Sequence, residues 1–130
     1  MVVNAKKGAE ETLRLVKEAG GDGVVVMADV ATRAGCGALA QAALGLYVWV
    51  NNAGLGFYTP FLSADDRLIE KQLEVTLKSV IYCSQEAARA MREGAIINAV
   101  SIAGIKPFPG LSIYSAAKAT IISARRGACA

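Results

Sequence analysis

The sequence contains no histidine, and this absence removes a large part of common enzyme chemistry. Serine–histidine–aspartate and cysteine–histidine catalysis both need an imidazole, and so does every metal site built on histidine. A proton-transfer group in this chain must therefore be a tyrosine, lysine, aspartate, glutamate or cysteine.

Cysteine is scarce as well. The chain has three, Cys36, Cys83 and Cys129, at wide spacings and without a C-x-x-C pair. An odd number at such spacings predicts neither a zinc site nor a disulfide framework. We therefore expect no bound metal and a reducing, cytoplasmic setting, with Cys83 in the core because it falls on the apolar side of a predicted helix.

Aromatic residues make up 6% of the chain, and the net charge is only +3, with the basic residues scattered. A nucleic-acid surface needs clustered basic residues interleaved with aromatics, so we expect no nucleic-acid partner. No apolar run reaches the roughly 20 residues that a membrane-spanning helix needs, so we expect no membrane association. The N-terminal charges follow apolar residues instead of preceding them, which argues against a signal peptide.

What the sequence does contain is a regular alternation of helical and apolar-strand patterns. The chain has 130 residues, of which 54% are hydrophobic, and this is enough for one domain with a core. Uninterrupted apolar runs predict strands buried on both faces, as in a parallel sheet. Strands are predicted at 23–29, 47–50 and 95–100, and helices at 9–20, 31–44, 65–92 and around Tyr114. This order predicts an α/β fold with a doubly wound parallel sheet.

Three polar residues follow the ends of predicted strands: Asp29, Asn52 and Ser101. Ligands bind doubly wound sheets outside the carboxyl ends of their strands, so we expect one crevice to collect these residues. The densest glycine cluster, at 20–23, follows a helix and precedes a strand, which is the wrong order for a phosphate-binding loop.

Residues 95–118 carry the candidate chemistry. A predicted strand ends at Ser101, a Gly/Pro-rich loop follows, and a helix then carries Tyr114 and Lys118. Residues four apart share one face of a helix, so a phenol and a cation are neighbours, and the cation favours the phenolate. A hydroxyl, a tyrosine and a lysine can form an acid–base unit, although such a pair also occurs by chance on many helices.

Four elements stand in order: residues 28–30, residues 51–54, Ser101, and the run YSAAK from Tyr114 to Lys118. This series resembles the short-chain dehydrogenase/reductase family over essentially the whole chain. The resemblance implies a Rossmann-type doubly wound parallel sheet in α/β/α layers, here a single partial domain over 1–130. It also implies an oxidoreductase that uses NADP or NAD to interconvert a carbonyl and a secondary alcohol, in the manner of a 3-oxoacyl-thioester reductase or a sugar or alcohol dehydrogenase.

The same resemblance implies the catalytic roles. Tyr114 would exchange a proton with the substrate oxygen, Lys118 would favour its phenolate, and Ser101 would hydrogen-bond the reacting group. Hydride transfer builds negative charge on a carbonyl oxygen, which two aimed donors would stabilise. Where the family has an asparagine on the long helix, an ungapped count from Asn52 places Thr76. Because a hydroxyl lacks an amide's separate carbonyl and NH₂ groups, we expect a weaker or rearranged proton relay at Thr76.

Cofactor contacts are implied in the same way. The strand at residues 2–3 is followed by no acidic residue but by Lys6 and Lys7. Two cations suit a 2′-phosphate and favour NADP over NAD. Both lysines could instead simply be solvated. Asp29 and Val30 would flank the adenine, and the riboses would lie against Asn52, Ala53, Gly54, Tyr114 and Lys118. Asp29 could instead be only a strand-end or cap residue. Asn51 is expected to be structural, with its side chain bonding backbone across strands.

Parts of the family's pattern have no counterpart here. The glycine-rich loop that binds the pyrophosphate is missing, and so is the strand before it. In the family that strand lies at the centre of the sheet. It would join the strands at 2–3 and 23–29 to those at 47–50 and 95–100. The family's segments beyond about Ala124 are missing too, and the link from 43 to 48 is short. We therefore expect an incomplete sequence.

The alternative is a non-catalytic Rossmann-like binding or interaction module. An intact mass well above that of 130 residues would favour the enzyme. For the enzyme, the expected partner is a small carbonyl or alcohol substrate, and the resemblance implies a homotetramer or homodimer built on the long helix and the Tyr114 helix. Candidate substrate-pocket residues are Leu55, Phe57, Lys106, Phe108 and Pro109.

Overall fold

The computed structural model describes residues 1–43 and 45–124, so that Cys129 and one residue of the short link lie outside the described residues. Its helices and strands alternate as predicted. In chain order they are β1 Val2–Val3, α1 Ala9–Glu18, β2 Val24–Val25, α2 Arg33–Ala42, β3 Val48–Asn51, α3 Asp66–Leu73, α4 Ser79–Ala90, β4 Ala95–Asn98 and α5 Ser112–Ala124. None of these helices in the described ranges is long and apolar enough to cross a membrane.

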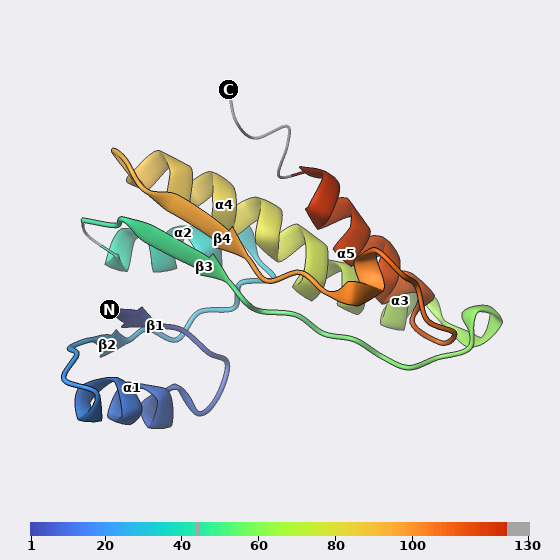
Figure 1. Cartoon of the computed structure of the whole chain (residues 1–130), viewed down its shortest axis with the longest axis horizontal. Coiled ribbons are helices and arrows are strands. Elements are labelled where there is room, and N and C mark those ends of the chain that lie inside the picture. The colour runs from blue at the N-terminus through green and yellow to red at the C-terminus, as the bar shows by residue number, and fades with distance from the viewer. Residues whose placement is uncertain (44, 125–130) are drawn as a thin grey trace.

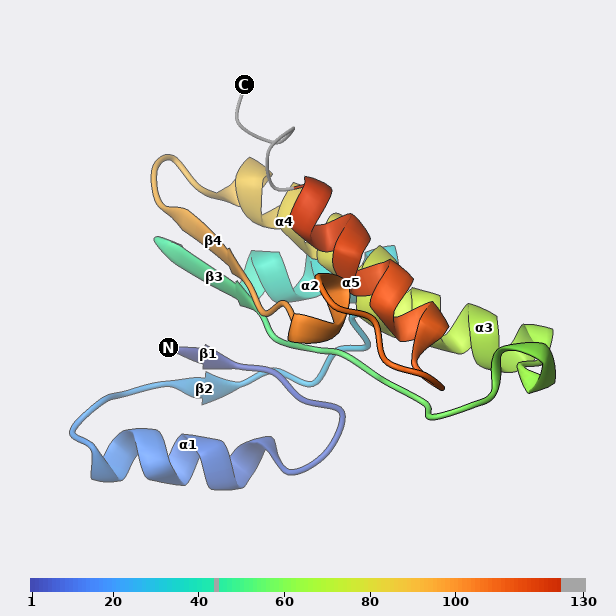
Figure 2. The same cartoon turned by 45° about the vertical axis from the view of Figure 1, so that its right-hand side comes forward.

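The strands form two separate parallel pairs. Val2 of β1 lies opposite Val24 of β2, and Val48 of β3 lies opposite Ala95 of β4. Figures 1 and 2 show β1 between β2 and β3, with α1 on the opposite side of the strands from α4. No backbone pairing joins β1 to β3. The chain therefore has a partial Rossmann-type α/β fold, divided where the central strand was expected to be missing.

The prediction that the strands are buried on both faces is wrong for this structure. In β3, Trp49 and Asn51 are buried, whereas Val48 and Val50 expose 53% and 57% of their surface. In β2, which has only two residues, Val24 is 55% exposed. The physical reason is that α4 packs on one face of β3 and β4, while the other face stays largely open to solvent.

The core lies where α2 and α4 pack against each other and against the inner face of β3. Its buried residues are Cys36, Leu39, Ala40, Trp49, Cys83 and Ala87, which confirms the core position predicted for Cys83. The predicted long helix is also present, although a π-helical turn at Glu74–Lys78 joins α3 to α4.

A chain of side-chain hydrogen bonds crosses this core. The Trp49 indole N–H donates to Asn51 Oδ1 at 2.7 Å. Asn51 Nδ2 in turn donates to Asn98 Oδ1 on β4 at 2.8 Å and to Ser84 Oγ on α4 at 2.9 Å. Asn51 is therefore structural, as expected, but its partners are side chains instead of backbone groups.

Replacing Asn51 by alanine leaves the buried indole N–H and the Asn98 amide without a partner. An unsatisfied buried polar group costs about 2 kcal/mol, so we expect N51A to lower the free energy of unfolding by about that amount. Urea denaturation measures the change. The exposed neighbour Asn52 is the control, because N52A should alter stability little; equal losses in both variants would contradict a role for this network.

Candidate active site

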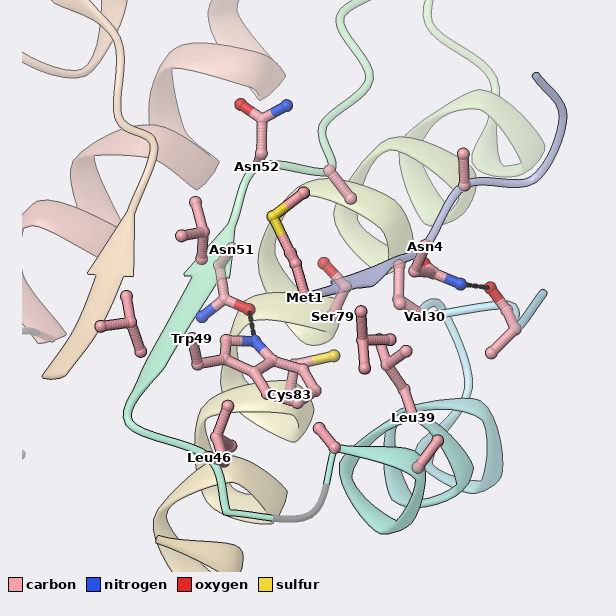
Figure 3. A pocket seen from close by; sticks show the side chains of 18 of the residues that line it. Met1, Asn4, Val30, Leu39, Leu46, Trp49, Asn51, Asn52, Ser79 and Cys83 are labelled. Atoms are coloured by element: carbon pink, nitrogen blue, oxygen red, sulfur yellow. Dashed lines mark hydrogen bonds between the residues drawn. The ribbon is translucent and has the colours of Figure 1, made fainter. Parts of the chain in front are cut away.

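A cavity of about 1070 Å³ separates β1 from β3. Its rim carries the residues that follow strand ends, which are Asp29, Val30, Asn52, Ala53 and Gly54. Figure 3 shows Asn52 at the end of β3 and Val30 on the α2 side, with the Met1 side chain extending between them. One crevice thus collects the residues predicted to contact the adenine and its ribose, while Ser101 lies outside the cavity lining.

Asn4, which follows β1, holds the Asp29 segment in place. Its Nδ2 donates to the Val26 carbonyl at 2.8 Å and to the Ala28 carbonyl at 3.1 Å. The Ala31 N–H, and secondarily Lys6, hold the pKa of Asp29 below its ordinary value, with Lys6 Nζ 3.2 Å from Asp29 Oδ2. Asp29 therefore stays ionised at neutral pH.

Lys118 is a buried cation on α5, with 3% of its surface exposed. Its Nζ donates to the Ala99 carbonyl at 2.6 Å and lies 5.7 Å from the centroid of the Tyr114 ring. Burial lowers the pKa of Lys118. A Cβ on Gly54 would lie 3.5 Å from Nζ, an ordinary van der Waals contact, so Gly54 lies directly beside the ammonium.

Ser101 follows β4 and caps the 3₁₀ turn Ile102–Gly104, with its Oγ accepting from the Ala103 N–H at 3.2 Å. Among the described residues, nothing accepts the hydroxyl proton of Ser101, so it can donate to a ligand. The turn rests directly on α5, because a Cβ on Gly104 would lie 2.8 Å from the Lys118 carbonyl carbon. Ser101 is thereby fixed against the helix that carries Tyr114 and Lys118.

Thr76 is fully buried in the π-helical turn. Its hydroxyl donates to the Leu55 carbonyl at 2.8 Å and accepts from the Leu55 N–H at 3.0 Å. Both hydrogen-bonding functions of the hydroxyl are thus engaged by one backbone unit. The structure gives Thr76 a role in holding the loop after β3, and its part in a proton relay stays a prediction.

Gln72, one helical turn before Thr76, was not identified from the sequence. It is 1% exposed, and its Oε1 accepts from the Phe57 N–H at 2.8 Å. Together Gln72 and Thr76 hold residues 55–57 against α5, where a Cβ on Gly56 would lie 3.2 Å from the Tyr114 ring. The four-residue spacing of two polar side chains was the available sequence signal, but only the fold shows that they face a loop.

The expected substrate-pocket residues belong to two loops that the structure ties together. The Thr59 N–H donates to the Gly110 carbonyl at 2.8 Å. Phe57 and Phe108 remain 38% and 42% exposed beside this link. The two loops therefore bring apolar surface near Tyr114 without closing over it.

Comparison with known proteins shows the family to which the chain belongs. A family model described as short chain dehydrogenase matches residues 1–129. The chain belongs to the short-chain dehydrogenase family. It is 35% identical over 127 residues to 3beta-hydroxysteroid dehydrogenase 1 of Eggerthella lenta, covering 89% of this chain and 48% of the relative.

Other members of the short-chain dehydrogenase family are similar to the chain in sequence or in structure. L-2,3-butanediol dehydrogenase of Corynebacterium glutamicum is 38% identical over 118 residues, covering 85% of this chain and 46% of the relative. The crystal structure of a metagenomic short-chain oxidoreductase in complex with NADP superposes with a TM-score of 0.90 at 26% identity, over 98% of this chain and 62% of that one. The 130-residue chain thus spans about half the length of the curated relatives it matches.

The backbone contact at Gly104 yields a test of the site's architecture. An alanine there would place its Cβ against the backbone of Lys118 and Ala119, neither of which can rotate away. We expect G104A to lower the free energy of unfolding by about 2 kcal/mol, as overpacking does.

Gly37 provides the control, because a Cβ added there has open space within 4 Å. Since it lies inside α2, G37A should instead raise stability by about 0.5–1 kcal/mol. Urea denaturation of both variants makes the comparison, and a G104A chain as stable as the unmodified one would show that the turn does not rest on α5.

Proposed function

We propose that the protein carrying this chain is an NAD(P)(H)-dependent oxidoreductase that interconverts a carbonyl compound and a secondary alcohol. The observation that carries the proposal is the convergence of three groups on α5. Tyr114 and the buried Lys118 share one face of the helix, and the turn that carries Ser101 rests on its backbone. The names of the two curated relatives, a hydroxysteroid dehydrogenase and a butanediol dehydrogenase, describe oxidation of alcohols.

A nicotinamide cofactor would supply or accept the hydride. The residues present fit one side of such a group, because Asp29 and Val30 lie at one rim of the cavity and Asn52 to Gly54 lie at the other. Asp29 and Val30 would hold the adenine, and Asn52, Ala53 and Gly54 would lie beside its ribose. Lys118, which lies beside Gly54, would hold the nicotinamide ribose.

Proton transfer would be the task of Tyr114. The Lys118 ammonium lies 5.7 Å from the centroid of the Tyr114 ring, and Tyr114 would release a proton to the substrate oxygen and recover it in the reverse direction. The free hydroxyl proton of Ser101 is a second donor for the negative charge that develops on that oxygen. Gln72 and Thr76 would act as positioning residues, because they hold the loop that touches the Tyr114 ring.

Replacing Tyr114 by phenylalanine removes the proton donor but keeps the ring that packs on the loop. We expect Y114F to lower kcat by about 10²–10⁴-fold, measured as the NAD(P)H-dependent reduction of a ketone, while the binding of NAD(P)H measured by fluorescence changes far less.

The neighbouring Ser115 is the matched control. Its buried Oγ has no hydrogen-bond partner among the described residues, so S115A should keep full activity and equal or greater stability. A Y114F enzyme as active as S115A would refute the assigned role of Tyr114.

We also propose that NADP is preferred over NAD. The support is the cationic pair Lys6 and Lys7 at the end of β1, although Lys6 is partly neutralised by Asp29. Loss of an exposed charge contact costs up to about 1 kcal/mol. We therefore expect K6A to raise KM for NADPH by up to about fivefold and to leave KM for NADH unchanged.

Lys17, exposed on α1 away from the cavity, is the charge-matched control, and K17A should alter neither constant. Equal changes in the two Michaelis constants on K6A would contradict recognition of a 2′-phosphate by Lys6.

A second candidate function is a non-catalytic binding module. The gap between β1 and β3 favours it, because none of the described residues beside the cavity forms a glycine-rich loop that would hold a cofactor's pyrophosphate. Fluorescence titration with NADPH separates the two candidates. Saturable binding supports the oxidoreductase, and its absence from the 130-residue chain supports the module.

Assembly and location complete the proposal. We propose a homodimer or homotetramer that uses the α3–α4 helix, on which Ile81 exposes 41% of its surface, together with α5. We also propose a cytoplasmic location, supported by the free state of Cys36 and Cys83.

A further inference from the structure

Two buried thiols lie side by side in the core, and neither takes part in the proposed reaction. Cys36 on α2 is fully buried, and Cys83 on α4 is 3% exposed. Cys83 Sγ donates to Cys36 Sγ at 2.7 Å, and Cys36 Sγ donates to the Val30 carbonyl at 3.2 Å. Because a disulfide bond is about 2.05 Å long, the sulfur atoms need to approach by less than one ångström to be bonded.

The cavity gives a small oxidant a route to this pair. Cys83 is one of the residues that line the cavity, whereas Cys36 is not. Figure 3 shows the Cys83 side chain between those of Trp49 and Leu39. A small molecule in the cavity therefore meets Cys83 first, with Cys36 directly behind it.

We propose that Cys36 and Cys83 form an oxidation site that hydrogen peroxide converts to a disulfide between α2 and α4. The Cys83 sulfur attacks a peroxide oxygen, the O–O bond breaks, and hydroxide leaves with the thiol proton as water, giving a sulfenic acid. The Cys36 sulfur then attacks the Cys83 sulfur and displaces hydroxide, which leaves with the second thiol proton. Two thiols are oxidised, one peroxide is reduced to two waters, and one S–S bond forms.

The surroundings of the pair set the conditions for this reaction. Burial raises the pKa of both thiols; the Glu86 charge acts on both, and those of Arg33 and Asp29 act on Cys36. Because the thiolate is the nucleophile, the reaction accelerates as pH rises above neutral.

Oxidation has two consequences for the fold. The bond closes the chain between 36 and 83 and so raises the temperature of unfolding. It also removes the S–H donor of the Val30 carbonyl, which would couple the redox state to the adenine rim if the proposed function holds.

The test uses the full chain with Cys129→Ser, which leaves these two thiols alone. The protein is treated with peroxide at about pH 8.5, where a larger fraction of the two buried thiols is ionised than at neutral pH, and the reaction is stopped with catalase. Unfolding and alkylation with N-ethylmaleimide follow, and the intact mass is measured. We expect the labelled thiols to fall from two to none and the unlabelled mass to fall by two hydrogen atoms.

Digestion with trypsin without a reductant then identifies the bond. The expected product joins the peptide 79–89 to the peptide 34–67. The double variant Cys36→Ser, Cys129→Ser keeps Cys83 in the same helix and should gain oxygen atoms without forming any joined peptide.

Two labelled thiols after peroxide, or added oxygen atoms without a joined peptide in the Cys129→Ser chain, would overturn the proposal. A midpoint of thermal unfolding that does not rise on oxidation would show that the bond does not form in the native arrangement of α2 and α4. None of these readouts needs nucleotide binding or turnover, so a failure here leaves the oxidoreductase proposal untouched.

Discussion

The buried ammonium of Lys118 is the constraint on which the rest of the candidate site depends. A cation that is 3% exposed needs a partner, and the Ala99 carbonyl at 2.6 Å provides it. That single bond ties α5 to the chain just after β4. The turn Ile102–Gly104 can then rest on the α5 backbone, which places Ser101 beside the helix that carries Tyr114.

A second set of buried polar groups fixes the opposite wall. Thr76 and Gln72 satisfy the backbone of residues 55–57, a segment that has no strand to pair with. The helix thus takes the place of a neighbouring strand. Because the loop contacts the Tyr114 ring through Gly56, the wall and α5 position each other.

The cavity between β1 and β3 links the two halves of the structure. It collects the rim residues proposed to hold the nucleotide, and it also leaves one edge of each strand pair unpaired. Cys83, although buried, is one of the residues that line this opening, while the Trp49–Asn51–Asn98 network holds β3 to β4 on the far side.

Residue pattern alone determined the alternation of helices and strands, the family, and the spacing of Tyr114 and Lys118, because each depends on short-range periodicity or on order along the chain. It also indicated the split of the sheet, since the order of the elements leaves β1 and β3 without the strand between them. Tertiary structure alone decided which buried polar groups meet. These contacts join residues that are distant in sequence: Asn4 donates to the Ala28 carbonyl, Gln72 accepts from the Phe57 N–H, Gly104 rests on α5, and Cys36 lies beside Cys83. One-sided burial of the strands was decided there too, because an apolar run cannot reveal whether a helix covers its second face.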